Sequence, residues 1–355
     1  MMDKHFLDLF KEIQKDHEQS AGMTLNDKIL IVDGLNFFIR AWSATPSLND
    51  DGNHVGGVIG FLKSVGALIR QFKPSRCILV FDGTGGSSRR KKLYPEYKAH
   101  RQFKVNVNRA EHMKHSDDVE LESMRLQFQR LAMYLKVLPM TTLSVNNVEA
   151  DDVISYIATE LYPKAQIIIC SSDKDFLQLV DDSRIRVWSP IKKKLFDKEA
   201  MLLTYKIYAH NYLLSRMFDG DNSDNISGIR GVGQKTLQKK VPILFEDKQI
   251  QIEDIITYCK DKISGGSKYA IYQKIIDGED ILNRNWKLMN LREYDISGTI
   301  LSSIQHQVNN NIPELNKLEF RDMLYQDKMM VHLLNFDTWL PSSFGTLDSF
   351  ARIKK

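Results

Sequence analysis

Three short apolar runs, each followed closely by an aspartate, most constrain what this chain can form. They read KILIVD at 28–33, CILVFD at 77–82 and QIIICSSD at 166–173. Continuous apolar runs of this length are typical of strands buried on both faces of a parallel sheet. Their alternation with helical periodicity predicts an α/β sheet with right-handed connections. The expected helices lie roughly at 56–72, 118–136 and 149–161.

The aspartates at the ends of these runs are expected to lie together. In open α/β sheets, ligands bind beyond the carboxyl ends of the strands. Asp33, Asp82 and Asp173 should therefore share one edge of the sheet. Further acids occur in two unusual contexts, EADD at 149–152 and GDNSDN at 220–225.

Each acidic group alone has an ordinary explanation as a turn or as a helix N-terminus, which the helix dipole stabilises. Three acids in four positions repel one another, however, and a bound cation would remove that penalty. Hard divalent cations prefer oxygen ligands, and two of them about 3.5–4 Å apart promote in-line displacement at a phosphodiester. The sequence therefore predicts a site for two Mg²⁺, with Mn²⁺ as the alternative. The candidate ligands are Asp33, Asp82, Glu149, Asp151, Asp152, Asp173, Asp175, Asp221 and Asp224.

Basic residues are concentrated between these acids. The whole chain has 49 Lys and Arg against 45 Asp and Glu, which argues against a simple polybasic binder. Residues 83–110 alone hold eight basic residues and one acid. Cations interleaved with aromatic rings favour binding of a nucleic-acid single strand or end. The candidates are Arg89, Arg90, Lys98 and Arg101, with Tyr94 and Tyr97 between them.

A glycine-rich turn, GIRGVGQKT at 228–236, follows the last acids. Glycines let a backbone approach a phosphate closely, and a following helix N-terminus supplies N–H donors. The alternative is a tight turn between helices, but its position directly after DNSDN favours nucleic-acid binding. The residues concerned are Gly228, Gly231, Gly233, Lys235 and Thr236.

The cellular setting is constrained by what composition excludes. No apolar stretch has the ~20 residues of a membrane span, and the start lacks an apolar signal-peptide core. Cys77, Cys170 and Cys259 are far apart, so a reducing compartment fits better than a disulfide framework.

These motifs together resemble those of the 5′-nuclease superfamily, which includes flap endonucleases and the 5′-nuclease domain of bacterial DNA polymerase I. The resemblance is strongest to the bacteriophage RNase H and flap endonuclease branch and covers roughly residues 27–290. It is specific because the motifs occur in the family's order. They are IVDG (31–34), FDG (81–83), YPEYKAHR (94–101), EADD (149–152), SSDKDF (171–176) and GDNSDNISGIRGVGQKT (220–236).

The resemblance implies a PIN-like parallel-sheet domain followed by a helical domain with a helix–three-turn–helix motif at 228–236. It implies metal-dependent 5′→3′ cleavage at free 5′ ends and 5′ flaps, with removal of RNA primers in lagging-strand replication. We expect a stand-alone monomeric nuclease acting on branched or nicked duplexes and RNA–DNA hybrids in the cytoplasm of a bacterial host. The expected parts are an amphipathic extension (1–26), the nuclease domain (27–195) with a basic arch (83–118), the helical domain (196–340) and a flexible tail (341–355).

Residue by residue, the resemblance divides the acids between two ions. Asp33, Asp82, Glu149, Asp151 and Asp173 match the first metal site, whereas Asp175, Asp221 and Asp224 match the second. Asp152 matches an acid beside them.

Other family roles fall on the arch, the glycine turn and the tail. Lys98 and Arg101 match arch residues that hold the scissile phosphate, and Tyr97 matches an aromatic that stacks on a base. The glycine turn matches an element that grips one duplex strand through a bound K⁺. The tail places Leu347 and Phe350 at anchor positions of a sliding-clamp-binding peptide, and a single-strand-binding protein is the other expected partner.

Two alternatives remain open at this stage. A PIN-type endoribonuclease acting on single-stranded RNA shares the strand-end acids but normally lacks the glycine turn. A structure-specific DNA-binding protein without catalysis should lack part of the acid set, and here every position is filled.

Overall fold

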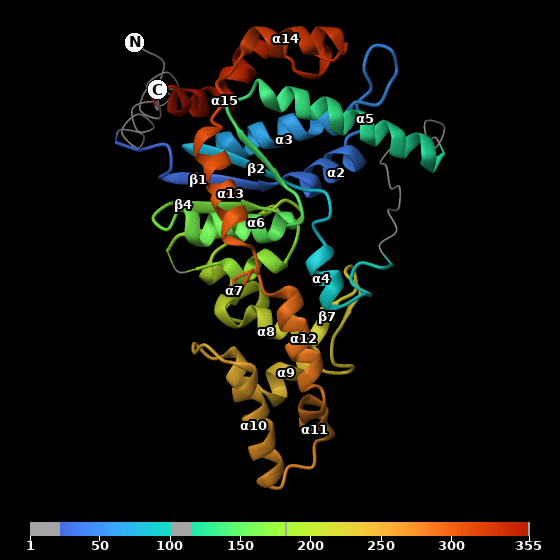
Figure 1. The fold of residues 1–355 in the computed structure, drawn as a ribbon, viewed down its shortest axis with the longest axis vertical. Coiled ribbons are helices and arrows are strands. Elements are labelled where there is room, and N and C mark those ends of the chain that lie inside the picture. Colours follow the sequence, from blue (N-terminus) through green and yellow to red (C-terminus); the bar gives the residue numbers. More distant parts are fainter. Residues whose placement is uncertain (1–21, 101–115, 182, 354–355) are drawn as a thin grey trace, which may run out of the picture.

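A six-stranded sheet forms the centre of the protein in a computed structural model that describes residues 22–100, 116–181 and 183–353 (Figure 1). The strand order is β3-β2-β1-β4-β5-β6, and all neighbours are parallel except β5 and β6. The predicted parallel α/β fold is confirmed. The strands are β1 (Lys28–Asp33), β2 (Arg76–Asp82), β3 (Thr141–Val145), β4 (Gln166–Cys170), β5 (Ile185–Ser189) and β6 (Lys194–Phe196).

The register of the sheet sets where the acids lie. Val32 of β1 pairs with Leu79 of β2 on one side and with Cys170 of β4 on the other. The three predicted strands therefore end level with one another. Their aspartates emerge at the same edge of the sheet, as their positions after the apolar runs predicted.

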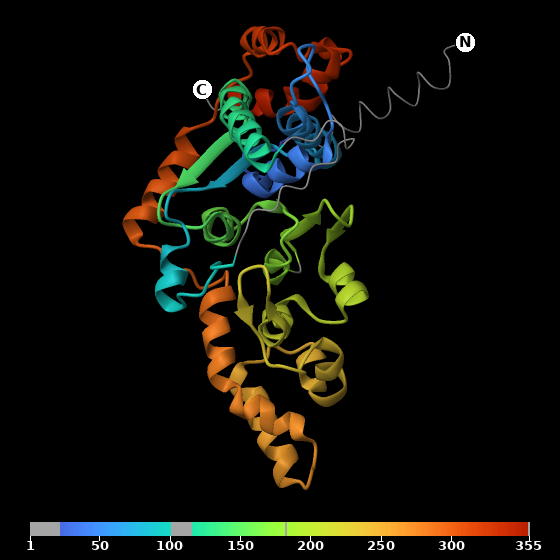
Figure 2. The same cartoon turned by 90° about the vertical axis from the view of Figure 1, so that its right-hand side faces the viewer.

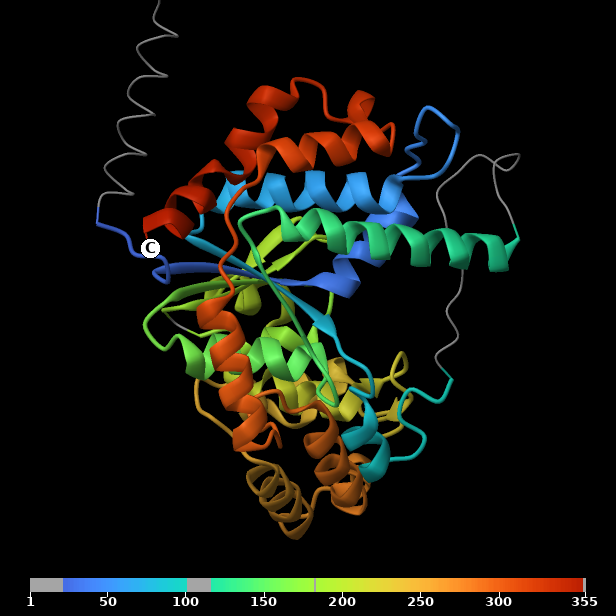
Figure 3. The ribbon, with the colours of Figure 1, turned by 45° about the horizontal axis from the view of Figure 1, so that its top comes forward.

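Helices cover both faces of the sheet (Figures 2 and 3). Successive strand residues point to opposite faces, so Leu30 belongs to one apolar core and Ile31 to the other. The first face carries α2 (Gly34–Ala44), α3 (Gly56–Phe72), α5 (Asp117–Lys136) and α15 (Phe336–Ile353). The second face carries α6 (Ala150–Tyr156), its continuation η2 (Ile157–Leu161), η3 (Asp175–Leu179) and α8 (Ala209–Asp219).

The second core continues without a break into the helical part of the chain. There, α10 and α11 lie farthest from the sheet along the long axis of the molecule (Figure 1). The elements are α7 (Lys198–Tyr205), β7 (Gly220–Asp221), β8 (Ile226–Ser227), α9 (Gln234–Lys240), η4 (Pro242–Phe245), α10 (Ile252–Ser264), α11 (Ala270–Asp277) and α12 (Glu279–Met289).

The chain then returns to the sheet. Helix α13 (Gly298–Asn310) lies along the edge strand β3, where Thr141 Oγ1 donates to the Asn311 carbonyl at 2.8 Å. Helix α14 (Lys317–Gln326) and η5 (Met330–His332) lead to α15. Residues after about 298 thus belong with the sheet, whereas the expected helical domain ran to 340.

The expected flexible tail at 341–355 is wrong for its described residues. Residues 341–353 belong to α15, and Leu347 is 2% exposed and Phe350 is 9% exposed. Phe344 and Leu347 lie in the first apolar core, and Ser343 packs on Gly66 of α3. Apolar residues three and four apart form one helical stripe, which here covers the protein's own core. The two proposed clamp anchors therefore have a structural role.

The beginning of the chain and the arch are described in part. Residues 1–21 of the expected amphipathic extension lie outside the described residues, as do residues 101–115 of the arch. The described start of the arch contains a short helix, α4 (Ser88–Leu93).

Candidate metal and nucleic-acid site

Four acids gather at the carboxyl edge of the sheet, each fixed by a local hydrogen bond or helix start. The first, Asp173, follows β4, and its Oδ1 accepts from the Asp175 N–H at 2.8 Å. Asp33 caps α2, where Oδ1 accepts from the Asn36 N–H at 3.3 Å and Oδ2 accepts from Ser171 Oγ at 2.8 Å. Asp82 Oδ1 accepts from the Ala150 N–H at 2.9 Å, which ties the end of β2 to the start of α6. Asp151 lies in the first turn of that helix.

The electrostatics of this group show that the acids face one another. Burial, together with the charges of Asp173 and Asp82, raises the pKa of Asp33 to about 7 despite its two hydrogen bonds. Burial also raises the pKa of Asp151, to which Asp173 and Asp33 contribute by repulsion. Carboxyl groups this costly to ionise together are a suitable environment for a divalent cation, which would relieve their repulsion.

A second group of acids surrounds a basic side chain of α8. The guanidinium of Arg216 lies 3.1 Å from Asp175 and 2.8 Å from Asp221. Burial and the charge of Asp173 raise the pKa of Asp175 to about 7, although Arg216 opposes the shift. Burial opposes ionisation of Asp221 as well, but hydrogen bonds from Ser223 and the charge of Arg216 outweigh it and lower the pKa.

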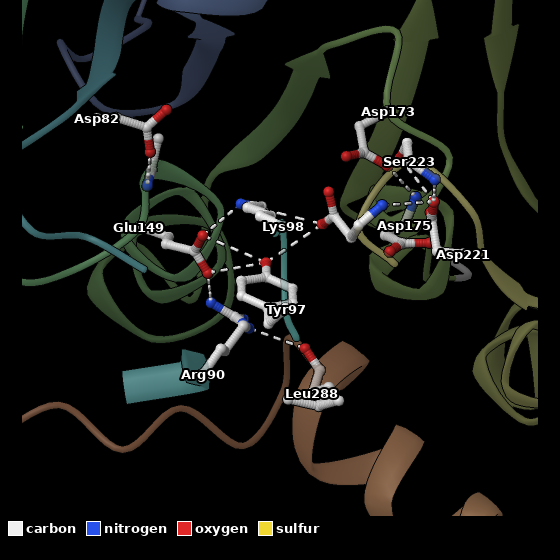
Figure 4. A network of polar contacts seen from close by, with 12 residues as sticks. Asp82, Arg90, Tyr97, Lys98, Glu149, Asp173, Asp175, Asp221, Ser223 and Leu288 are labelled. Carbon is white, nitrogen blue, oxygen red and sulfur yellow. Dashed lines mark hydrogen bonds and ion pairs between the residues drawn. The ribbon is translucent and has the colours of Figure 1, made fainter. Parts of the chain in front are cut away.

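Arg90 holds the third group, and its predicted contact with DNA is wrong in this structure. Its side chain is 3% exposed and makes an ion pair with Glu149 (Figure 4) and a second one with Asp152. Nη1 and Nη2 lie 2.9 and 2.7 Å from the two oxygens of Asp152. Nε donates to the carbonyl of Leu288 in α12 at 2.8 Å. Arg90 thereby joins the arch start, the nuclease core and the helical part.

Asp152 is consequently corrected from a metal ligand to a buried partner of Arg90. It is 3% exposed, and Arg89 Nη2 lies 3.7 Å from its Oδ2, which Arg90 also contacts. Successive helix positions point about 100° apart, so neighbouring acids of EADD cannot all face one ion. Burial opposes ionisation of Glu149, yet Arg90 and Lys98 lower its pKa, so it is an ionised carboxylate.

Tyr97 and Lys98 fold back into the same network. The Tyr97 ring is buried rather than free to stack on a base, and its hydroxyl lies 3.2 Å from both Glu149 Oε2 and Asp224 Oδ2. Lys98 Nζ makes an ion pair with Glu149 (Figure 4) and also lies 3.9 Å from Asp224. The Lys98 N–H also donates to the Asp224 carbonyl at 2.9 Å. The arch start is thus anchored on the DNSDN loop.

The predicted ligands are near one another but are not assembled around an ion. Within residues 22–100, 116–181 and 183–353, no three His, Cys, Asp or Glu side chains are placed to hold one metal together. One reason is that Lys98, Arg90 and Arg216 each make an ion pair with at least one of these acids. The donor chemistry nevertheless fits Mg²⁺, since the acids supply oxygen alone and several repel each other.

The glycine turn packs closely on the protein's own backbone, while its predicted approach to a phosphate stays a prediction. A Cβ on Gly228 would overlap the carbonyl oxygen of Phe218, and Gly231 has φ +83°. Gly233 precedes α9, where Lys235 is exposed and Thr236 is half-buried. Of the basic residues, Arg89 is half-buried, and Arg101 lies outside the described residues.

Sequence reasoning missed Arg216 and Ser171, which contact the acids directly. Ser171 could have been noticed, because it lies two residues before Asp173 at a strand end. Arg216 lies within α8, five residues before Asp221, and no motif in the surrounding sequence indicates that it contacts the acids.

Comparison with known proteins agrees with this geometry. The family model of the 5′-3′ exonuclease N-terminal resolvase-like domain matches residues 28–206, just over half of the chain. A 5′-3′ exonuclease of Aquifex aeolicus is 30% identical over 210 residues, which cover 59% of this chain and 66% of that protein. A DNA polymerase I of Caldicellulosiruptor bescii is 26% identical over 256 residues, or 70% of this chain and 28% of the polymerase.

Solved structures agree on the fold. The bacteriophage T5 flap endonuclease, in a pseudo-enzyme-product complex with DNA and metal ions, matches with a TM-score of 0.57 and 22% identity. The match covers 85% of this chain and 99% of that structure. No helix within the described residues is long and apolar enough to cross a membrane.

Proposed function

The chain belongs to the family of 5′-3′ exonucleases with the N-terminal resolvase-like domain, and on that premise we propose that it is a two-metal 5′ nuclease. Its substrates would be the 5′ ends of nicked duplexes, 5′ flaps of branched DNA and RNA primers on DNA. The Aquifex relative, of which the chain spans just under two thirds, carries the name of the exonuclease activity, and the T5 structure carries that of the flap activity.

The observation that carries the proposal is the mutual repulsion of the acids at the sheet edge. Asp33, Asp151 and Asp173 come from three separate elements, yet they lie close enough for burial, together with repulsion among their charges, to raise the pKa values of Asp33 and Asp151. In a protein that only bound DNA, several buried acids would be unfavourable, because they are costly to ionise and would repel phosphate once ionised. Bound Mg²⁺ ions would supply a nucleophilic hydroxide and offset charge on the phosphate.

The basic residues would act on the substrate side. Lys98 lies at the acids and could offset the charge that develops at the scissile phosphate once it leaves Glu149. Arg101 would do the same from the arch. The glycine turn at 228–236 would hold one strand of the duplex through backbone N–H groups, with K⁺ as the counter-ion.

A cleavage assay with the Asp173→Asn variant tests this proposal. Asparagine keeps the size of the side chain but removes a charge that acts on Asp33, Asp151 and Asp175. We expect turnover on end-labelled flap, nicked and RNA-primed duplexes to fall by at least about 10³-fold, or about 4 kcal/mol of transition-state stabilisation. DNA binding should change little.

The matched control is Asp322→Asn, an exposed aspartate of α14, away from both the acids and the glycine turn. It should cleave at the parental rate. Normal cleavage by Asp173→Asn would refute the ligand assignment. Cleavage of unstructured RNA in preference to all three duplexes would instead favour the endoribonuclease alternative.

A further inference from the structure

A guanidinium lies between two of the acids expected to hold the second ion. Arg216 Nη2 is 2.8 Å from Asp221 Oδ2, and Nε is 3.1 Å from Asp175 Oδ1. Nη1 donates to the carbonyl of Gly220 at 3.2 Å. These three contacts fix the planar group in one position, as the forked geometry of arginine allows.

The position of Arg216 is accessible to ions from solvent. Its side chain is 18% exposed, and it lines a cavity of about 500 Å³ together with Asp173, Asp221 and Asn36. A cation entering this cavity would meet Asp221, whose carboxylate is already paired with Arg216. Within the described residues, by contrast, no Lys or Arg makes an ion pair with Asp33, Asp82 or Asp151.

We propose that Arg216 is a positioning residue that takes the place of the second ion's charge in the metal-free protein and competes with that ion. This inference rests on the proposed two-metal function. The guanidinium keeps Asp175 and Asp221 together when no metal is bound, because two unpaired carboxylates would repel each other. It also repels an arriving Mg²⁺. The second ion should therefore bind more weakly than the first.

Calorimetric titration of the DNA-free protein with Mn²⁺ tests the competition without depending on catalysis. The parental protein should bind two ions with separate affinities. In Arg216→Gln, the Kd of the weaker ion should fall by about tenfold, which corresponds to about 1.4 kcal/mol. Arg216→Lys keeps the charge but loses the fork, so it should bind the weaker ion with nearly parental affinity.

Arg184→Gln is the matched control. Arg184 hydrogen-bonds to the carbonyls of Ala158 and Tyr162 and lies before β5, away from the carboxyl edge. The Arg184→Gln variant should bind both Mn²⁺ ions with the affinities of the parental protein.

Thermal unfolding gives an independent readout. In EDTA, Arg216→Gln should melt below the parental protein, and saturating Mn²⁺ should remove most of the difference. If Arg216→Gln does not fold without metal, the titration of Arg216→Lys becomes the deciding experiment. Tenfold tighter binding of the weaker ion by Arg216→Lys would contradict the proposed competition, because this variant keeps the positive charge.

Unchanged or weaker binding of the second ion by Arg216→Gln would also overturn the inference. If the parental protein binds fewer than two ions, the two-metal function itself fails, and the parental titration alone shows this.

Discussion

Replacement of Arg90 by methionine should destabilise the protein by breaking a buried ion-pair network. The side chain is 3% exposed and pairs with both Glu149 and Asp152. Methionine fills a similar volume, so the main loss is electrostatic compensation rather than packing. Removal of one partner from a buried ion pair costs about 3–5 kcal/mol, because the other charge stays buried without compensation.

The structure shows which acid bears this cost. Glu149 keeps Lys98 and the Tyr97 hydroxyl as partners, whereas Asp152 keeps only the more distant Arg89 among its described contacts, at 3.7 Å. We therefore expect Arg90→Met to cost about 3 kcal/mol, near the lower end of the range for a broken pair. Asp152→Asn should cost less, about 1–2 kcal/mol, because Arg90 remains paired with Glu149.

Urea unfolding of the two single variants and the double variant in EDTA measures these values. The double variant should be more stable than the sum of the single losses predicts, by about 2 kcal/mol, because the two residues are direct partners. A loss below about 1 kcal/mol for Arg90→Met would refute the reasoning, because such losses are typical of exposed pairs.

The same Asp152→Asn variant tests the correction of the metal ligands. It should bind Mn²⁺ within twofold of the parental affinity, since Asp152 faces Arg90. A tenfold loss would return Asp152 to the ligand set.

Three other outcomes follow from the structure. The raised pKa of Asp33, about 7 against about 4 unfolded, means that this carboxyl binds an extra proton in the metal-free fold. Its contribution to stability in EDTA should be fully present below pH 4 and be lost, by a few kcal/mol, as the pH rises to about 7, which gives stability a falling slope between these values. Below about pH 4 the lowered pKa values of Glu149 and Asp221 act in the opposite direction. Asp33→Asn should flatten this slope in thermal melts, and an unchanged slope would contradict the assignment. Leu347→Ala should lower the free energy of unfolding in urea by about 2–5 kcal/mol, because this side chain is buried, whereas Leu334→Ala, at an exposed position, should lower it by less than about 0.5 kcal/mol. Equal effects of the two variants would show that the C-terminal residues do not pack on the core. Gly228→Ala should lower both duplex binding, measured by gel shift, and thermal stability more than Gly231→Ala does, because the new methyl group would overlap the Phe218 carbonyl. At Gly231 the strain comes only from the positive φ and costs about 1 kcal/mol. A larger effect at Gly231 than at Gly228 would contradict the close contact of Gly228.

The parts that could be predicted from sequence are those set by local pattern. β1, β2 and β4 are continuous apolar runs, and parallel pairing brings their terminal aspartates to one edge. β3 reads TTLSV and β5 reads IRVWS, both partly exposed strands with a weaker apolar signal, and neither was predicted. Helix α15 was missed because a pair of apolar residues three apart does not reveal whether it contacts a partner or the chain's own core.

The direction of charged side chains was the least predictable feature, and it changes how the site is understood. Arg89 and Arg90 were predicted to contact nucleic acid, yet Arg90 pairs with acids about 60 residues later in the chain. Formal charge along a sequence is the same whether a cation faces solvent or a buried carboxylate. The small net charge of the chain therefore does not arise from an acidic pocket set in a separate basic surface. Three cations, Arg90, Lys98 and Arg216, lie among the acids themselves.

This interleaving has a consequence for the proposed reaction. Lys98 contacts an oxygen of Glu149 that a metal ion would also use, and Arg216 contacts oxygens of Asp175 and Asp221, so each cation opposes the charge of an ion bound there. An ion bound by Glu149 would move Lys98, and an ion bound by Asp175 and Asp221 would move Arg216, whereas Asp33, Asp82 and Asp151 have no such partner within the described residues. Lys98, once moved, would be free to contact a phosphate. Charge balance at the site would then be conserved while its partners change. Metal loading and phosphate binding would favour each other, since each removes the charge that opposes the other.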